Sequence, residues 1–368
     1  MSGISVGIIG AGYWGPNLIR NFSACPLTQC VAVCDSSPSR LEAIGRQFNH
    51  VKLIASVDQL LEMELDAVAI ATPVSTHYEL ASRCLAAGLH VLVEKPLAAT
   101  VQEATALVEL ADRCSRVLMV DHTYLFNNAV KRIKQLVNDG ELGDLYYVDS
   151  VRINLGQFQR DINVVWDLAP HDLSIVDYVL DLPARSISAW GCGHTREDLE
   201  DIAYVNVDYG DQLQANFHVN WLSPVKLRQM IFAGSRKSLI FNDLNTTEPI
   251  KVYDRGIELD NPPGSETQRR LMVGYRTGDV WSPYVNPGEA LQNVARHFAE
   301  CIAEGNPPTS DGRMGLRVVR LLEAANRSLR AQGGRIVLPN GNHRDVSNRS
   351  RAVRPGELLP HRAECAPG

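Results

Sequence analysis

Over the first 120 residues, short apolar runs alternate with stretches whose apolar positions recur every three or four residues. Continuous apolar runs are typical of strands buried on both faces, and the longer period indicates amphipathic helices. The expected strands are 4–9, 30–34, 67–71, 90–93 and 117–120, and the expected helices are 15–24, 38–48, 76–87 and 100–114. Alternation of strands and helices predicts a parallel sheet covered on both faces, so we assign residues 1–121 to a doubly wound α/β domain.

Beyond His122 the pattern changes to runs with a period of two, which predicts strands with one buried face. A helix is expected at 128–139, strands at 145–154, 186–192, 203–209, 213–221, 228–234 and 237–241, and two helices at 288–304 and 312–331. This order predicts a second, α+β domain over residues 122–339, built on a large, open and mostly antiparallel sheet. Residues 340–368 carry several arginines and prolines with few apolar residues, so we expect a flexible tail.

A glycine-rich turn follows the first expected strand, in the form Gly10-x-Gly12-x-x-Gly15, and Asp35 follows the next strand. The first glycine permits a tight turn, the second lets a pyrophosphate approach the backbone, and the third lets the helix pack against the strand. The phosphates then lie at a helix N-terminus, which favours negative charge. The motif in this setting predicts a Rossmann domain that binds a dinucleotide; an ordinary glycine turn is the alternative.

Asp35 favours NAD over NADP, because a carboxylate there accepts hydrogen bonds from ribose hydroxyls and repels a 2′-phosphate. Ser36 and Arg40 lie close by, which keeps a phosphate pocket open, although Arg40 is equally explained as a solvated helix residue. The residues expected around the cofactor are Gly10, Gly12, Tyr13, Trp14, Gly15, Asp35, Ser36, Arg40, Thr72, Pro73, His77, Glu94, Lys95 and His122.

Two of these groups follow later strands of the expected parallel sheet, at the carboxyl edge where ligands bind. Thr72-Pro73 leads to His77, which is interpreted either as a neighbour of cofactor or substrate, or as a surface residue beyond a helix cap. In Glu94-Lys95-Pro96, the proline restrains the lysine backbone to extended conformations, so that Lys95 is aimed at the site. A lysine there suits proton exchange with a hydroxyl, whereas an exposed lysine near a turn is the alternative.

Near the start of the second domain, Asp167 and His171 are four residues apart. On a helical turn the two side chains share a face and are able to form a hydrogen bond. A carboxylate that orients an imidazole is an arrangement suited to a general base, although such a pair is also common at surfaces. Pro170 leaves the helical geometry of the pair open.

Taken together, these motifs resemble the Gfo/Idh/MocA family, named for glucose–fructose oxidoreductase and inositol dehydrogenase. The resemblance covers nearly the whole chain and includes the segment from Asp311 to Glu323. It implies that Lys95, Asp167 and His171 are catalytic, and that the open sheet makes oligomer contacts, as in a homodimer or homotetramer. The chain departs from the common pattern at Leu125 and Asn128, where many members have arginine and proline, and at 162–166, where many have paired glycines.

The segment 152–166 resembles members that oxidise the 3-hydroxyl of a sugar before transamination. The resemblance thus implies an NAD-dependent sugar or cyclitol dehydrogenase acting on a free sugar, nucleotide sugar or aminoglycoside. The residues expected at the substrate are Tyr124, Arg152, Asn154, Gln157, Asn163, Trp166, Asp167 and His171. An NADPH-dependent keto-sugar reductase and a non-catalytic dinucleotide sensor remain as alternatives, because a Rossmann fold alone does not fix function.

Composition narrows the partners to small molecules. The chain has 368 residues, a net charge of −6 and a pI near 5.9, which gives no basic surface for nucleic acid or anionic membranes. No apolar run is long enough for a membrane span, and no charged leader precedes the first strand, so we expect a cytoplasmic protein. The eight cysteines are scattered without metal-ligand spacing, so no metal site is expected.

Overall fold

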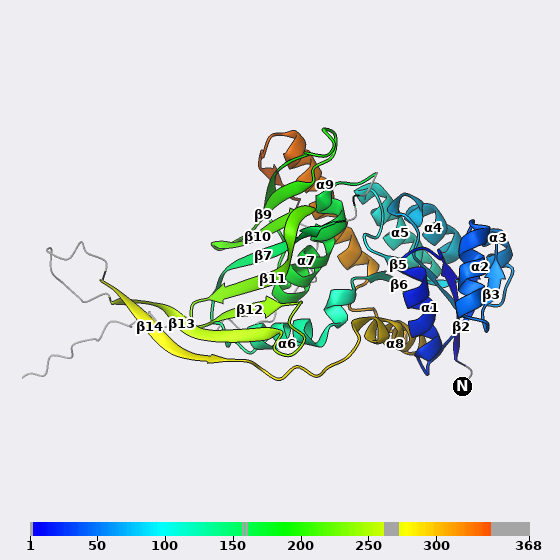
Figure 1. Cartoon of the computed structure of the whole chain (residues 1–368), viewed down its shortest axis with the longest axis horizontal. Helices are drawn as coiled ribbons and strands as arrows, with labels where there is room; N and C mark the ends of the chain where they lie inside the picture. The colour runs from blue at the N-terminus through cyan, green and yellow to red at the C-terminus, as the bar shows by residue number, and fades with distance from the viewer. Residues whose placement is uncertain (1–2, 157, 159–160, 261–271, 340–368) are drawn as a thin grey trace, which may run out of the picture.

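The computed structural model describes residues 3–156, 158, 161–260 and 272–339, and two sheets organise this part of the chain (Figure 1). The first sheet is parallel, with the strand order β3-β2-β1-β4-β5-β6. Its strands are β1 (Ile4–Ile9), β2 (Thr28–Cys34), β3 (Lys52–Ile54), β4 (Ala67–Ile70), β5 (His90–Glu94) and β6 (Leu118–Asp121). The helices between them are α1 (Gly15–Ala24), α2 (Pro38–Gln47), α3 (Val57–Leu61), α4 (His77–Ala86) and α5 (Val101–Cys114), and the 3₁₀ turns η1 (Val74–Thr76) and η2 (Thr123–Phe126) follow β4 and β6.

The second sheet is mixed and mostly antiparallel, with the order β14-β13-β12-β11-β7-β10-β9-β8-β15 and only β7 and β10 parallel among its described pairs. Its strands are β7 (Leu145–Leu155), β8 (Ser186–Cys192), β9 (Ile202–Gly210), β10 (Leu213–Asn220), β11 (Leu222–Gly234), β12 (Ser238–Asn242), β13 (Ile250–Asp260), β14 (Met272–Trp281) and β15 (Ile336–Val337). The accompanying helices are α6 (Asn128–Asn138), α7 (Val164–Leu180), α8 (Ala290–Glu304) and α9 (Gly312–Arg330). The expected fold class is therefore confirmed.

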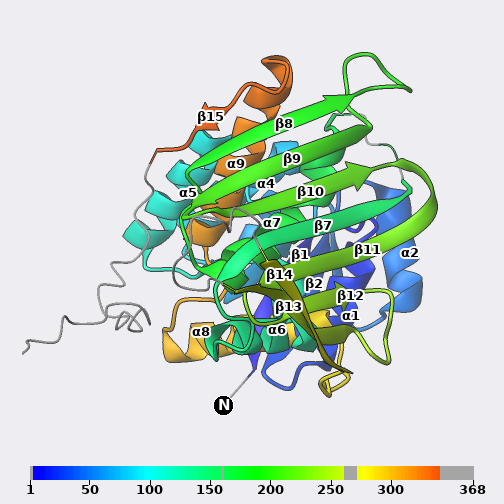
Figure 2. The ribbon, with the colours of Figure 1, turned by 90° about the vertical axis from the view of Figure 1, so that its left-hand side faces the viewer.

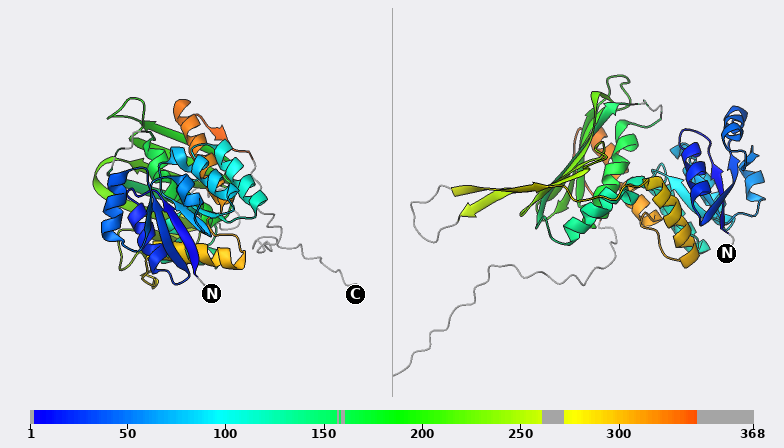
Figure 3. Two further views of the ribbon diagram at one scale, coloured as in Figure 1. Left: turned by 90° about the vertical axis from the view of Figure 1, so that its right-hand side faces the viewer. Right: turned by 60° about the horizontal axis from the view of Figure 1, so that its bottom comes forward.

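Side-chain alternation explains why one face of the second sheet is covered and the other is open. In β10, Leu213, Ala215, Phe217 and Val219 are buried, while the residues between them are half-buried or exposed. Helices α7 and α9 cover the buried face and lie between the two sheets, and the other face is open (Figures 2 and 3). The β13–β14 hairpin extends away from the body of the molecule (Figure 1).

The later part of the chain returns to the first sheet. Helix α8 packs against α1, and its Val294 and Phe298 share a buried cluster with Ile8 and Phe22. Helix α9 packs against both α5 and β8, so it contacts both halves. Helices that follow the second sheet thus complete the core of the first sheet and hold the two halves together.

Several elements were not expected from the pattern. Helix α7 is buried along most of its sides, so it lacks an amphipathic period, and Pro170 lies in its interior. Strand β11 begins earlier than the expected residue 228, and the hairpin strands, β3 and β15 were not expected. In the described residues no helix has both the length and the apolar composition to cross a membrane.

Candidate active site

The glycine-rich turn has the geometry that its sequence predicts. Gly10 has φ +104°, and a Cβ there would lie 2.5 Å from the Ala71 carbonyl oxygen. A Cβ on Gly15 would lie 2.4 Å from the Gly10 carbonyl oxygen, so the helix packs against the turn only with glycine there. At Gly12 a Cβ would meet no protein atom within 4 Å. The turn therefore leaves an open approach to its backbone at Gly12, as a bound pyrophosphate requires.

Asp35 links this turn to the end of β2. Its carboxylate accepts hydrogen bonds from the Ala11 and Ser37 backbone N–H groups, each at 2.8 Å. Arg40, half exposed, places Nη1 3.6 Å from the Asp35 Oδ2. The carboxylate is thus held at the edge where an adenosine ribose is expected, and Arg40 is partly neutralised by it.

Other residues expected at the cofactor lie around the same turn. Tyr13 is 80% exposed and Trp14 is 39% exposed, with their rings edge to face on the outer side of the turn, and Ser36 is exposed. None of these three side chains is fixed by the core, so each is accessible to a dinucleotide. Their roles in binding remain predictions.

His77 joins the turns after β4 and β5. Its Nδ1 lies 2.9 Å from the Pro96 carbonyl oxygen and its Nε2 lies 2.9 Å from the Thr72 carbonyl oxygen. Burial lowers the pKa of His77, so the neutral ring donates one of these hydrogen bonds at a time. With both ring nitrogens occupied, His77 positions Thr72-Pro73 beside Lys95-Pro96, and the Lys95–Pro96 peptide is cis.

Two buried carboxyl groups, Glu94 and Asp121, are neighbours on β5 and β6. Thr123 donates a hydrogen bond to the Asp121 Oδ1, and the Glu94 and Asp121 side chains form a hydrogen bond with each other, which requires a proton on one of the two carboxyl groups. Burial and the nearby Asp121 raise the pKa of Glu94 well above its usual range, and burial raises the pKa of Asp121 to about 6. Burial therefore favours the protonated form of Glu94.

The next residue, His122, is also buried, and neither of its ring nitrogens has a partner among the described residues. Burial lowers the pKa of His122 to about 3, so the ring is neutral. It offers one donor and one acceptor at the carboxyl edge of the sheet. Unpaired buried polar atoms at this position fit a polar ligand such as the nicotinamide end of a dinucleotide.

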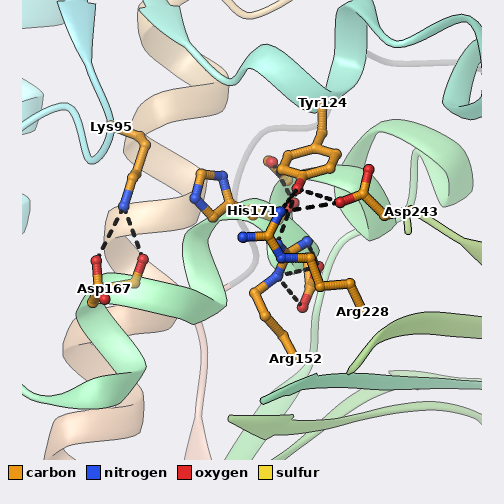
Figure 4. A network of polar contacts seen from close by, with 9 residues as sticks. Lys95, Tyr124, Arg152, Asp167, His171, Arg228 and Asp243 are labelled. Carbon is orange, nitrogen blue, oxygen red and sulfur yellow. Dashed lines mark hydrogen bonds and ion pairs between the residues drawn. The ribbon is translucent and has the colours of Figure 1, made fainter. Parts of the chain in front are cut away.

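Lys95 points from the end of β5 to α7 (Figure 4). Its Nζ donates a 2.8 Å hydrogen bond to the Asp167 carbonyl oxygen and lies 3.5 Å from the Asp167 Oδ1. Pro170 lies inside the same helix and has no N–H, which leaves the Trp166 carbonyl without its usual helical donor. The expected hydrogen bond between Asp167 and His171 is not made in the structure, because the Asp167 Oδ2 accepts from Trp221 Nε1 at 3.0 Å and Oδ1 faces Lys95.

His171 lies between Lys95 and a network of polar side chains (Figure 4). The ring of Tyr124 packs edge-on against it, with centroids 5.2 Å apart. The Tyr124 hydroxyl donates to Asp243 at 2.9 Å and accepts from Arg152 and Arg228, each at 3.1 Å. Tyr124 therefore replaces the expected Asp167 as the side chain that contacts the imidazole.

Asp172 anchors this network from α7. Arg152 donates to its carboxylate at 2.6, 3.0 and 3.1 Å, and the two side chains are only 5% and 2% exposed. Burial alone would lower the pKa of Arg152, but the Asp172 carboxylate raises it above the usual value. The guanidinium is thus a fixed positive charge beneath Tyr124.

The electrostatic surroundings of His171 make it a neutral base. Burial lowers the pKa of His171 well below its usual value, and the positive charges of Lys95 and Arg152 lower it further. Its Nδ1 has no partner among the described residues. A neutral imidazole beside an ammonium group is able to accept a proton from a hydroxyl held between them.

The remaining residues expected at the substrate are less close to this centre. Asn154 lies on β7 on the same face as Arg152 and donates to the Leu155 carbonyl oxygen. Asn163 caps α7 and donates to Glu200 and Asn326. Trp166 is buried and lines a pocket together with Asn163, and Gln157 lies outside the described residues.

Sequence reasoning missed Asp121, Asp172, Trp221, Arg228 and Asp243. Asp172 carried a signal, because a charged residue among the apolar neighbours of α7 implies a buried partner. Arg228 and Asp243 carried none, since their contact with Tyr124 joins segments more than 100 residues apart.

The glycine turn, the held carboxylate and the lysine–histidine centre together define a dinucleotide-dependent oxidoreductase. Residues 4–122 match the family model described as "Oxidoreductase family, NAD-binding Rossmann fold", and residues 130–240 match the "GFO/IDH/MocA C-terminal domain". These two models together span more than half of the chain. The protein belongs to the Gfo/Idh/MocA family of oxidoreductases.

Individual relatives agree with this assignment. The chain is 28% identical over 316 residues to UDP-N-acetylglucosamine 3-dehydrogenase of Acidithiobacillus ferrooxidans, covering 85% of this chain and 93% of the relative. It is 26% identical over 345 residues to D-apiose dehydrogenase of Paraburkholderia graminis, covering 90% and 88%. A solved structure of the Acidithiobacillus enzyme, GnnA, superposes with a TM-score of 0.75 at 26% identity, covering 90% of this chain and 99% of GnnA.

Proposed function

We propose that this protein oxidises a secondary hydroxyl, at C3, of a sugar, nucleotide sugar or aminoglycoside-type cyclitol to a ketone, with NAD as the acceptor. The observation that carries the proposal is the neutral His171 beside Lys95 at the carboxyl edge of the first sheet. The names of relatives that dehydrogenate UDP-N-acetylglucosamine and D-apiose support a sugar substrate. Such a ketone is the species that transamination consumes, which suggests a place in amino-sugar or aminoglycoside biosynthesis.

The cofactor would be held by the described residues of the first sheet. The backbone at Gly12 would accommodate the pyrophosphate, Asp35 the adenosine ribose, and Glu94 and His122 the nicotinamide end. When bound, NAD supplies the acceptor for the hydride that leaves the carbinol carbon. Asp35 would favour NAD over NADP, because its carboxylate repels a 2′-phosphate.

The chain's own residues would move the proton and hold the hydroxyl. His171 takes the proton from the substrate hydroxyl, and Lys95 donates a hydrogen bond to the same oxygen. Asp167 holds Lys95 through its carbonyl and its carboxylate, and Tyr124 holds the plane of the His171 ring. Asn154 of β7 would contact the remaining polar groups of the substrate, whereas the buried Arg152 would act indirectly, through the Tyr124 hydroxyl.

The experiment that tests this proposal follows NADH formation with UDP-N-acetylglucosamine, other UDP-sugars, sugar phosphates, inositols and pseudosaccharide aminoglycosides. NADP replaces NAD in a parallel series, and a 2-oxo acid is added to recycle tightly held NADH. Turnover with NAD and one of these alcohols supports the proposal. No turnover in either direction despite tight dinucleotide binding would instead favour a non-catalytic sensor.

Replacement of Lys95 by Met tests the catalytic assignment. We expect turnover to fall by about a hundredfold or more, the usual contribution of general acid–base groups, while NADH binding measured by fluorescence stays unchanged. Lys131→Met, in α6 outside this network, is the matched control. Near-normal turnover of the Lys95 variant would remove Lys95 from the mechanism.

The reverse activity, reduction of a keto-sugar with NADPH, is the second candidate. The observation that favours it is Arg40, which lies within 3.6 Å of Asp35 and is exposed enough to turn toward a 2′-phosphate. Comparison of NADH and NADPH oxidation with a 3-keto sugar separates the two. An Arg40→Ala variant that loses activity with NADPH alone would support the second candidate.

We also propose that copies of the chain associate through the open face of the second sheet, as a homodimer or homotetramer. Trp190 and Tyr204 are about half exposed there, and His218 stacks on Tyr204 with centroids 4.4 Å apart. An exposed aromatic group on an open sheet is typical of an interaction surface. Light scattering of the wild type and of Trp190→Glu tests this: a stable monomer in the wild type would contradict it.

We also propose that the boundary between the two domains lies between residues 121 and 122. Helices α8 and α9 follow that boundary in the sequence but pack against the first domain. Co-expression of residues 1–121 and 122–368 as separate chains tests this boundary, since the two pieces should associate through α8 and α9.

A further inference from the structure

A cavity of about 190 Å³ lies away from the lysine–histidine centre, where α9 meets the edge of the second sheet. Its lining comprises residues of α9, Asp177 of α7, residues 183–184, Tyr209 of β9 and residues 337–339. Val101, the first residue of α5, also lines it, so the cavity touches both halves of the molecule. Its volume suits a small organic molecule and is too small for a dinucleotide or nucleotide sugar.

The positive charge of this cavity is not fully compensated. Arg317 is paired with Asp177 through two nitrogens, at 2.7 to 3.2 Å. Glu323 accepts a hydrogen bond from the Val101 backbone N–H at 3.0 Å. Arg320 and Arg327 also line the cavity, and neither side chain has a hydrogen bond or ion pair with any described residue. The lining therefore carries one net positive charge.

The hydroxyl of Tyr209 independently indicates that the cavity binds a ligand. It is 5% exposed, it lines the cavity, and its hydroxyl has no hydrogen-bond partner among the described residues. Burial raises the pKa of Tyr209, so the hydroxyl keeps its proton and remains a donor. A buried hydroxyl without a partner is costly, and an acceptor atom inside the cavity would satisfy it.

We propose that this cavity binds a small organic carboxylate with an apolar body. Arg320 and Arg327 would hold the carboxylate, the Tyr209 hydroxyl would donate a hydrogen bond to it, and Leu321 and Ala324 would contact the apolar body. A single net positive charge matches a monoanion better than a phosphate dianion. Because α5 and α9 meet at the cavity, a bound ligand would add contacts between the two halves.

Benzoate is the probe that tests the proposal by titration calorimetry on the full chain, at fixed ionic strength. Benzamide, which has the same shape without the charge, and acetate, which lacks the apolar body, are the controls. We expect saturable benzoate binding and at least about tenfold weaker binding of both controls, since hydrogen bonds to a charged group are among the stronger ones. Absence of saturable benzoate binding overturns the proposal.

Measurements of benzoate binding on variants test whether the ligand binds in this cavity. Arg320→Gln and Tyr209→Phe should each weaken benzoate binding by about tenfold, and Tyr209→Phe should not lower the melting temperature because it removes only an unpartnered hydroxyl. Arg330→Gln, on the last residue of the same helix, is the matched control and should bind as the wild type does. Unchanged binding in both cavity variants, or loss of binding in Lys95→Met, would assign benzoate to another site.

Discussion

The ion pair between Arg152 and Asp172 is expected to decide both the stability of the second sheet's core and the position of the His171 imidazole, the proposed base. Asp172→Asn keeps the side-chain shape and one acceptor oxygen but removes the negative charge. The Arg152 guanidinium, 5% exposed, then remains buried without a counter-charge. Removal of one partner of such a pair costs about 3 to 5 kcal/mol, a large part of the 5 to 15 kcal/mol by which proteins are typically stable.

Urea unfolding followed by tryptophan fluorescence measures this loss. Asp112→Asn is the matched control, because the Arg313–Asp112 pair is 60% and 57% exposed and should contribute less than about 1 kcal/mol. If Asp172→Asn unfolded at the same urea concentration as the wild type, the reasoning from the buried charge would be refuted.

The double variant Arg152→Met with Asp172→Leu separates the effect of the unpaired charge on stability from the effect of the ion pair on turnover. Replacement of both partners by apolar residues is often neutral for stability, so most of the lost free energy should return. Turnover should stay low, because the hydroxyl of Tyr124 loses the Arg152 donor and the ring that packs on His171 is less firmly held. A double variant as unstable as Asp172→Asn would show that the cost does not arise from the unpaired charge.

Three further predictions concern the two halves of the site. Gly12→Ala should fold with unchanged stability, because its Cβ meets no protein atom, yet bind NADH at least about tenfold more weakly, as fluorescence titration would measure. Burial raises the pKa of Asp121 to about 6 in the folded protein, so the contribution of this carboxyl group to stability is present in acid and is lost as the pH rises through that value. The Asp121→Asn variant should therefore be more stable than the wild type by about 1 to 3 kcal/mol near pH 8. Near pH 4 the two proteins should differ little in stability. His171 has a lowered pKa, so kcat/KM should stay level as pH falls through about 6.5, whereas a decline centred there would show an unperturbed imidazole.

Most of the fold could be predicted because its signals are local. The glycine turn and Asp35 specify the first βαβ unit within 35 residues, and the period of two in β9 and β10 specifies their buried faces. Helix α7 could not be predicted, because it is buried along most of its sides and contains Pro170. Neither an amphipathic period nor a clear boundary therefore marks it in the sequence.

The site divides in the same way. Lys95 and His171 could be proposed from motifs, because each lies beside a proline and at a defined spacing from its neighbours. The partner of His171 could not, because Asp167 looks suitable in sequence while its oxygens are occupied by Trp221 and Lys95. Only the folded chain brings Trp221 to that carboxylate.

This arrangement gives Asp167 a different part in the chemistry from the one its spacing suggests. A carboxylate bonded to His171 would raise the basicity of the imidazole and keep it partly charged. Placed on Lys95 instead, it orients the ammonium group, while burial of His171 and the positive charges of Lys95 and Arg152 lower the pKa of the ring and keep it neutral. In the proposed mechanism, His171 accordingly accepts the proton and Lys95 stabilises the developing alkoxide. The division of roles follows from the position of one carboxylate, which makes Asp167→Asn a test of Lys95 geometry and not of imidazole basicity.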